Sequence, residues 1–180
     1  GDYFKKLEQT VKNSRYLPKW VGELYLEYHR GTYTSMAKNK RYNRKSEFLY
    51  QDTEFLSSLA MLFGREYPQQ FINQGWETIL LNQFHDIIPG SSIREVYEDS
   101  KKQYEEIIGV GKELVNKATE GIGAQIDLKE RSVVVYNTLA FDRDDIVTFE
   151  VPSDIQHPCI MDDNGQLLPC QVVEDKDGKR

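Results

Sequence analysis

The chain has 180 residues, of which 39% are hydrophobic and 12% aromatic, so it can form a packed core rather than a disordered tail. Its formal net charge of −6 argues against nucleic-acid binding, because contact with phosphates needs a basic face. No apolar run reaches the roughly 18 residues that a membrane-spanning helix needs, so we predict a soluble chain without membrane contact.

Residues 1–45 combine a helical pattern with a strand-like pattern. Near the N-terminus, apolar side chains recur at helical spacing at Tyr3, Phe4, Leu7 and Val11. Residues 23–28 alternate with period two, which predicts a strand followed by a loop at 29–31. A helix that leads into one strand is half of an α/β unit and cannot bury both faces of its own sheet, so we expect this segment to be a truncated piece.

Residues 46–122 have the apolar spacing of three helices. The first is predicted to end at Gly64 and to present one broad apolar face, made of Phe48, Phe55, Leu59 and Leu62 beside Leu49, Leu56, Ala60 and Phe63. The second follows Pro68 and continues until Pro89-Gly90 forbids a further turn. The third opens at Ser92-Ile93-Arg94-Glu95, a capping-box pattern. Short connections between amphipathic helices predict a small antiparallel three-helix bundle.

From about residue 130, short apolar runs alternate with turn-rich Asn, Asp, Pro and Gly. We predict strands at 133–136, 146–151 and 167–168, with a hairpin turning at 163–165. Cys159 and Cys170 could face each other across this hairpin, but we expect free thiols in a reducing cytoplasm. A few strands leave an open sheet edge, so a larger β domain is expected here. The fold class is therefore mainly α with a β extension.

The segment with the most suggestive chemistry is His85-Asp86, at the predicted end of the second helix and directly before Ile87-Ile88-Pro89-Gly90. A neutral imidazole is a good zinc ligand, and an adjacent carboxylate can bind the metal, orient a neighbour or accept hydrogen bonds from sugar hydroxyls. Spacing alone also allows a hydrogen-bonded histidine that simply ends a helix. His29 follows the predicted strand, where loops of α/β proteins carry functional side chains, although it could equally be an ordinary loop histidine.

Three stretches, in order, resemble the α-mannosidases of glycoside hydrolase family 38, especially the bacterial and cytosolic branch: residues 23–35 (ELYLEYHRGTYTS), 80–92 (LLNQFHDIIPGSS) and 135–141 (VYNTLAF). The third departs from the family at Thr138, where a proline is common. The resemblance implies that residues 1–45 end the α/β catalytic domain, 46–122 form a three-helix middle domain, and 130–180 begin a β-sandwich domain.

The resemblance also implies residue roles. His85 would be a zinc ligand, Asp86 would contact sugar hydroxyls or support the metal, and His29 would lie beside the bound mannose of a mannose-containing oligosaccharide or glycan. The family is zinc-dependent and retaining, and its nucleophile and other zinc ligands would lie outside this chain, in the rest of the same polypeptide. We therefore expect a cytoplasmic enzyme, open to homo-oligomer formation, whose isolated 180-residue piece is inactive. The alternative is a non-enzymatic helical interaction module with a β extension.

Overall fold

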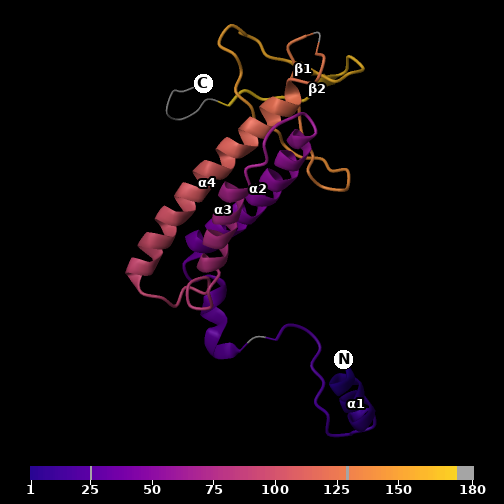
Figure 1. The fold of residues 1–180 in the computed structure, drawn as a ribbon, viewed down its shortest axis with the longest axis vertical. Coiled ribbons are helices and arrows are strands. Elements are labelled where there is room, and N and C mark those ends of the chain that lie inside the picture. The colour runs from indigo at the N-terminus through magenta and orange to yellow at the C-terminus, as the bar shows by residue number, and fades with distance from the viewer. Residues whose placement is uncertain (25, 129, 174–180) are drawn as a thin grey trace. The chain divides into compact units, whose positions relative to one another are not determined.

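The computed structural model describes residues 1–24, 26–128 and 130–173. Within them the chain is mainly helical with one small antiparallel sheet, and it divides into two compact units, 1–129 and 130–180 (Figure 1). The elements in chain order are α1 (Asp2–Val11), the 3-10 helix η1 (Glu27–Tyr33), α2 (Ala37–Met61), α3 (Gln69–Asn82), α4 (Arg94–Gly123), β1 (Ile160–Met161) and β2 (Leu167–Leu168). In this described part, no helix is long and apolar enough to cross a membrane.

Helices α2, α3 and α4 pack against one another and enclose the core of the first unit (Figure 1). The core cluster consists of Tyr50, Ile79, Tyr104 and Ile107, flanked by Tyr42, Trp76 and Ile108. The two long helices α2 and α4 run in the same direction, because Asn39 accepts a hydrogen bond from Ser100 and the Tyr50 hydroxyl reaches the Ile107 carbonyl further along both helices. Helix α3 runs against them.

A glycine allows the close approach of α3 to α2. A Cβ added at Gly75 would lie 1.9 Å from Cε1 of Tyr50, well inside van der Waals contact. The Tyr50 ring is fully buried, and its hydroxyl donates a 3.0 Å hydrogen bond to the carbonyl of Ile107. The ring therefore fills the space that a side chain at position 75 would need.

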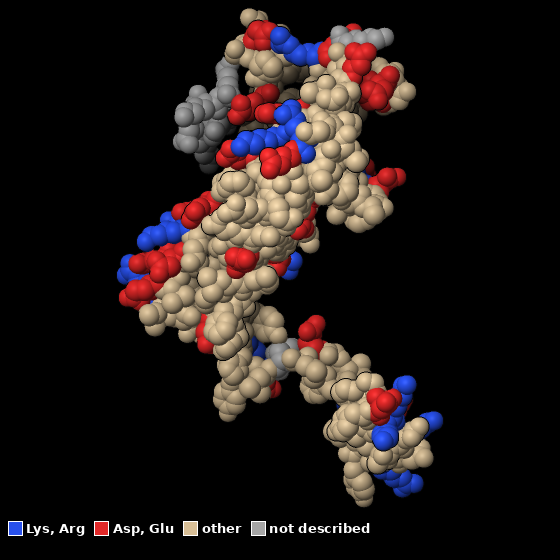
Figure 2. Space-filling model, viewed as in Figure 1, with Lys and Arg blue, Asp and Glu red and all other residues tan. Residues whose placement is uncertain are grey.

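The exposed surface of α4 carries ion pairs about one helical turn apart. Glu113 and Lys117 approach to 2.6 Å, and Arg94 and Glu98 to 2.8 Å. On the face drawn in Figure 2, acidic and basic side chains lie next to one another over the helices. Such pairs give modest support to a solvent-facing helix.

The first predicted helix exists, but its start and its core face differ from the prediction. Helix α2 begins at Ala37, well before Phe48, and its N-terminal half is buried through Asn39, Asn43 and Ser46, so no apolar stripe marks it. Phe48 and Phe55 are exposed. The buried face of α2 carries Tyr50, Leu56 and Ala60 together with small and polar side chains, so Leu56 and Ala60 of the predicted apolar face are confirmed.

The strand predicted at residues 23–28 is wrong. Glu23, Leu24 and Leu26 form no strand pairing, Tyr25 lies outside the described residues, and from Glu27 the chain forms η1. The local bonds are those of tight turns, with the His29 amide donating to the Leu26 carbonyl at 3.0 Å. An alternating sequence forms a strand only beside a partner strand, and none pairs with it in the described chain.

The β pattern of the second unit is confirmed only at its hairpin. Segments 133–136 and 146–151, predicted as strands, form no strand in the described chain, so those two predictions are wrong. Strand β2 pairs with β1, and Leu168 lies opposite Ile160. The turn between them is closed by Asp162, whose Oδ1 accepts from the amides of Asn164 and Gln166. Cys159 and Cys170 are exposed free thiols.

Candidate functional site

His85 and Asp86 lie in a tight turn just beyond α3, not within the last turn of a helix that continues to Pro89. Helix α3 stops at Asn82 because its final bonds tighten, and the Phe84 amide donates to the Leu81 carbonyl three residues back. Both side chains are exposed, at 75% for His85 and 60% for Asp86. His85 Nε2 is 3.2 Å from Asp86 Oδ2, and the imidazole lies against the Phe84 ring with centroids 4.2 Å apart.

The His85–Asp86 pair has donor chemistry and spacing that fit two positions of a zinc site. Two ligands at zinc–ligand distances of about 2.0–2.1 Å in tetrahedral geometry are separated by about 3.3 Å, close to the 3.2 Å between these two atoms. A hydrogen-bonded histidine–aspartate pair has the same separation. Within the described ranges, no group of three or more His, Cys, Asp or Glu side chains lies together in a way that could hold a metal ion.

The turn that carries the pair is held through three consecutive carbonyls. Ser92 Oγ donates to the Asp86 carbonyl at 2.6 Å, the Tyr97 hydroxyl donates to the Ile87 carbonyl at 3.1 Å, and Lys40 Nζ donates to the Ile88 carbonyl at 2.9 Å. The donors come from the segment before α4, from α4 and from α2. The path of the backbone beside His85 is therefore set by tertiary contacts.

The hydrogen bond from Ser92 to the Asp86 carbonyl explains why the predicted capping box does not form. Helix α4 begins at Arg94 with Ile93 as N-cap, and no side chain caps it. The Ser92 hydroxyl is committed to the Asp86 carbonyl instead. Ser92 thus stabilises the turn rather than the helix.

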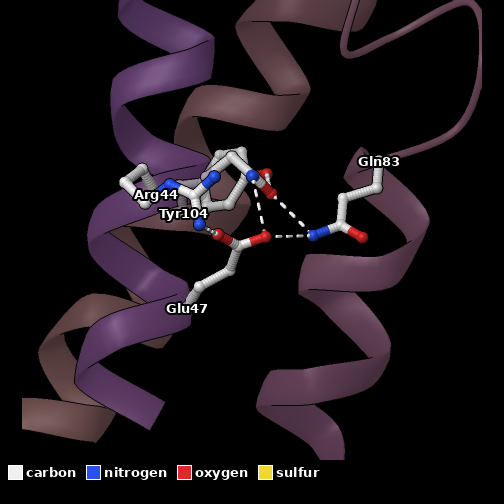
Figure 3. A network of polar contacts seen from close by, with 5 residues as sticks. Arg44, Glu47, Gln83 and Tyr104 are labelled. Carbon is white, nitrogen blue, oxygen red and sulfur yellow. Dashed lines mark hydrogen bonds and ion pairs between the residues drawn. The ribbon is translucent and has the colours of Figure 1, made fainter. Parts of the chain in front are cut away.

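A polar network fixes the end of α3 just before the turn (Figure 3). Gln83 Nε2 donates to Asn43 Oδ1 at 3.0 Å and to Glu47 Oε1 at 2.8 Å. Arg44 Nη1 lies 2.6 Å from Glu47 Oε2, and the buried Tyr104 hydroxyl donates to Asn43 Oδ1 at 3.3 Å. Burial, together with the Glu47 carboxylate, raises the pKa of Tyr104, so its hydroxyl keeps its proton. No local pattern predicts this network, since it joins three helices.

His29 is the third residue of η1 and is exposed. Its carbonyl accepts a 2.6 Å hydrogen bond from Thr32 Oγ1. In the described part of the chain, no hydrogen bond or ion pair joins its imidazole to His85 or Asp86. The two segments meet through Ser35 and Gly90 instead, where a Cβ on Gly90 would lie 2.7 Å from Ser35 Cβ.

Comparison with known proteins places these segments in one family. The family model described as "Alpha mannosidase middle domain" matches residues 27–122, a range that includes His29, His85 and Asp86. The chain is 38% identical over 154 residues to "Alpha-mannosidase 2C1" of Mus musculus, covering 84% of this chain and 14% of that protein.

Two further similar proteins also carry the name α-mannosidase. "Alpha-mannosidase G" of Dictyostelium discoideum is 42% identical over 122 residues, which cover 68% of this chain and 11% of that protein. "Alpha-mannosidase" of Saccharomyces cerevisiae is 31% identical over 153 residues, which cover 83% of this chain and 14% of that protein. The chain spans only about one seventh or less of these relatives. From its middle-domain match, which includes the His85–Asp86 turn, the chain belongs to the alpha-mannosidase family.

Proposed function

We propose that this chain is part of a zinc-dependent, retaining α-mannosidase of glycoside hydrolase family 38, of the bacterial and cytosolic branch, that removes terminal α-linked mannose from oligosaccharides or glycans. The observation that carries the proposal is the exposed His85–Asp86 pair on a braced turn inside the matched middle domain. The relatives' names describe those proteins as α-mannosidases, which supports the same activity for the intact protein.

In this proposal His85 is a zinc ligand, and Asp86 either shares the metal or accepts hydrogen bonds from mannose hydroxyls. His29 lies beside the bound sugar. Zinc would hold sugar hydroxyls and favour ring distortion toward an oxocarbenium-like transition state. A retaining glycosidase also needs two carboxyl groups about 5–5.5 Å apart across the scissile bond. We assign neither to this chain, so we expect residues 1–180 alone to be inactive.

The proposal includes a domain organisation and partners. By the sequence patterns, residues 1–45 would end the catalytic domain, 46–122 would form the three-helix middle domain and 130–180 would begin a β-sandwich domain. Helix α2 and the middle-domain match both begin before residue 46, at residues 37 and 27. Exposed aromatic side chains on the helices, such as Phe48, Phe55 and Phe71, suit contact with the rest of the same polypeptide. The exposed free thiols of Cys159 and Cys170 support a cytoplasmic location.

The test compares two histidine variants of the intact protein. We expect His85→Ala to lose bound zinc and to lower kcat/KM for an aryl α-mannoside by about a thousandfold or more, because removal of a ligand opens the metal site. His157→Ala is the matched control, since His157 is exposed in the second unit, and it should keep both properties. Full zinc content and activity in His85→Ala would show that the ligand assignment is wrong.

The second candidate function is a non-enzymatic helical interaction module, favoured by the same exposed aromatic side chains. It predicts that the intact, folded protein does not hydrolyse α-mannosides and that Phe48→Ser and Phe55→Ser abolish binding of its partner. Hydrolysis that depends on His85 would exclude it.

A further inference from the structure

Lys40 lies between the two segments of the proposed sugar site. Its half-buried ammonium donates hydrogen bonds to the Ser35 carbonyl and, at 2.9 Å, to the Ile88 carbonyl. The first carbonyl follows η1, which carries His29, and the second lies two residues after Asp86. Desolvation lowers the pKa of Lys40, consistent with an ammonium partly withdrawn from water and bound to protein carbonyls.

Gly90 allows the His85 turn to approach closely the segment that follows η1. With φ of +91°, it adopts a backbone conformation that favours glycine. A Cβ at this position would lie 2.7 Å from Ser35 Cβ, 2.9 Å from Ser35 O and 3.0 Å from Ser35 C. Two of these three neighbours are backbone atoms, so no side-chain rotation could relieve the contact.

Ser35 is itself tied to η1. Its amide and its Oγ both donate to the Gly31 carbonyl, at 2.9 Å and 2.7 Å. The next residue, Met36, has a left-handed backbone with φ of 51°, which is unfavourable for a non-glycine residue and persists only where surrounding contacts enforce it. Several contacts therefore join η1, α2 and the His85 turn at this junction.

From this geometry we infer that Lys40 is a positioning residue of the α-mannosidase site, and that with the Ser35–Gly90 contact it sets the placement of η1 and His29 relative to the His85–Asp86 turn. The inference rests on the function proposed above. Lys40 acts through two backbone carbonyls and touches neither metal nor sugar in this role. An ammonium suits it because one charged group can donate to both carbonyls at once.

The test uses Lys40→Met in the intact, zinc-loaded protein. This variant keeps an unbranched side chain but removes both donors, so the turn is free to shift. We expect kcat/KM for an aryl α-mannoside to fall about tenfold or more and zinc affinity, measured by chelator competition, to weaken by a similar factor. Lys40→Arg should recover part of both losses. Lys45→Met, an exposed lysine on the same helix, should stay within about twofold of wild type.

A purely structural lysine would give a different result. Lys40→Met would then lower the melting temperature but leave zinc affinity and kcat/KM of the folded protein within about twofold of wild type, and this outcome would overturn the inference.

The glycine contact has its own matched control. Gly90→Ala should weaken zinc affinity and activity, whereas Gly64→Ala has a similar left-handed φ of +78° with nothing within 4 Å, and should cost only backbone strain. Adding Ser35→Gly to Gly90→Ala should not restore function, because the backbone contacts remain. Equal zinc affinity and activity in Gly90→Ala and Gly64→Ala would contradict the role of this contact.

Hydrogen exchange separates failure of the inference from failure of the proposed function. Lys40→Met should speed exchange of the Ile87, Ile88 and Gly90 amides, all hydrogen-bonded within the turn, and Lys45→Met should not. If the wild-type protein hydrolyses no α-mannoside, the proposed function is wrong, but hydrogen exchange still tests whether Lys40 holds the His85 turn in place. If the wild type depends on His85 but Lys40→Met leaves activity, zinc affinity and exchange unchanged, only the positioning role falls.

Discussion

Two helical glycines should respond in opposite directions to the same substitution. Gly75 in α3 faces the buried Tyr50 ring, and an added Cβ would lie 1.9 Å from Cε1, 2.1 Å from Cζ and 2.3 Å from the hydroxyl oxygen. Gly109 lies in the middle of α4, is exposed and has nothing within 4 Å of an added Cβ. Gly75→Ala and Gly109→Ala therefore differ only in what the new methyl group meets.

The magnitudes follow from three effects. In either helix, alanine is favoured over glycine by about 0.5–1 kcal/mol. At Gly75 the methyl group must displace Tyr50, which costs about 1–3 kcal/mol for overpacking and roughly 1 kcal/mol more for the lost hydrogen bond to Ile107. We expect Gly75→Ala to destabilise the helical unit by about 1–3.5 kcal/mol, and Gly109→Ala to stabilise it by about 0.5–1 kcal/mol.

The assay is urea unfolding followed by far-UV circular dichroism, with the two variants and wild type compared at one pH. In a Tyr50→Leu background, the cost of Gly75→Ala should fall by about 1 kcal/mol or more, because the ring atoms that clash are gone. If Gly75→Ala matches Gly109→Ala in stability, Tyr50 does not pack on Gly75 and this reasoning is refuted.

Two further predictions concern ionisation. Burial raises the pKa of Tyr50 from its ordinary value of 10 to about 12. The protonated hydroxyl therefore contributes fully to the free energy of unfolding below pH 10, and this contribution is lost as pH rises through 12. This difference is worth roughly 3 kcal/mol. In Tyr50→Phe, the free energy of unfolding should fall less between pH 10 and pH 12 than in the wild type, by that amount. The same pH profile in both proteins would contradict this prediction. In the hairpin, hydrogen bonds from the Gln166 and Asn164 amides lower the pKa of Asp162. The turn should therefore hold above the ordinary aspartate pKa and loosen as pH falls through the lowered value. Asp162→Ala should abolish nuclear Overhauser contacts between Ile160 and Leu168, whereas Asp163→Ala should keep them; persistence in both variants would rule out the Asp162 turn.

Helical periodicity predicts α3 and α4 well because apolar side chains must recur on the face that packs. It fails for the first half of α2, where Asn39, Asn43 and Ser46 are buried through close helix contact rather than through apolar character. It also fails at residues 23–28. There the alternating pattern meets no partner strand in the described chain, and local turn bonds decide the backbone.

The sequence by itself determined the helical character of the chain, the helix break near Gly64, and the His85–Asp86 pair as the chemically notable feature; it placed the end of α3 too late, because the helix stops at Asn82 rather than at Pro89-Gly90. These follow from local patterns, because spacing and turn residues act over a few positions. Only the tertiary structure decided that Gln83 bonds to Glu47, 36 positions away, and that Lys40 bonds to the Ile88 carbonyl, 48 positions away. Such contacts leave no periodic trace, since each depends on how closely two helices pack and on which polar groups that packing withdraws from water.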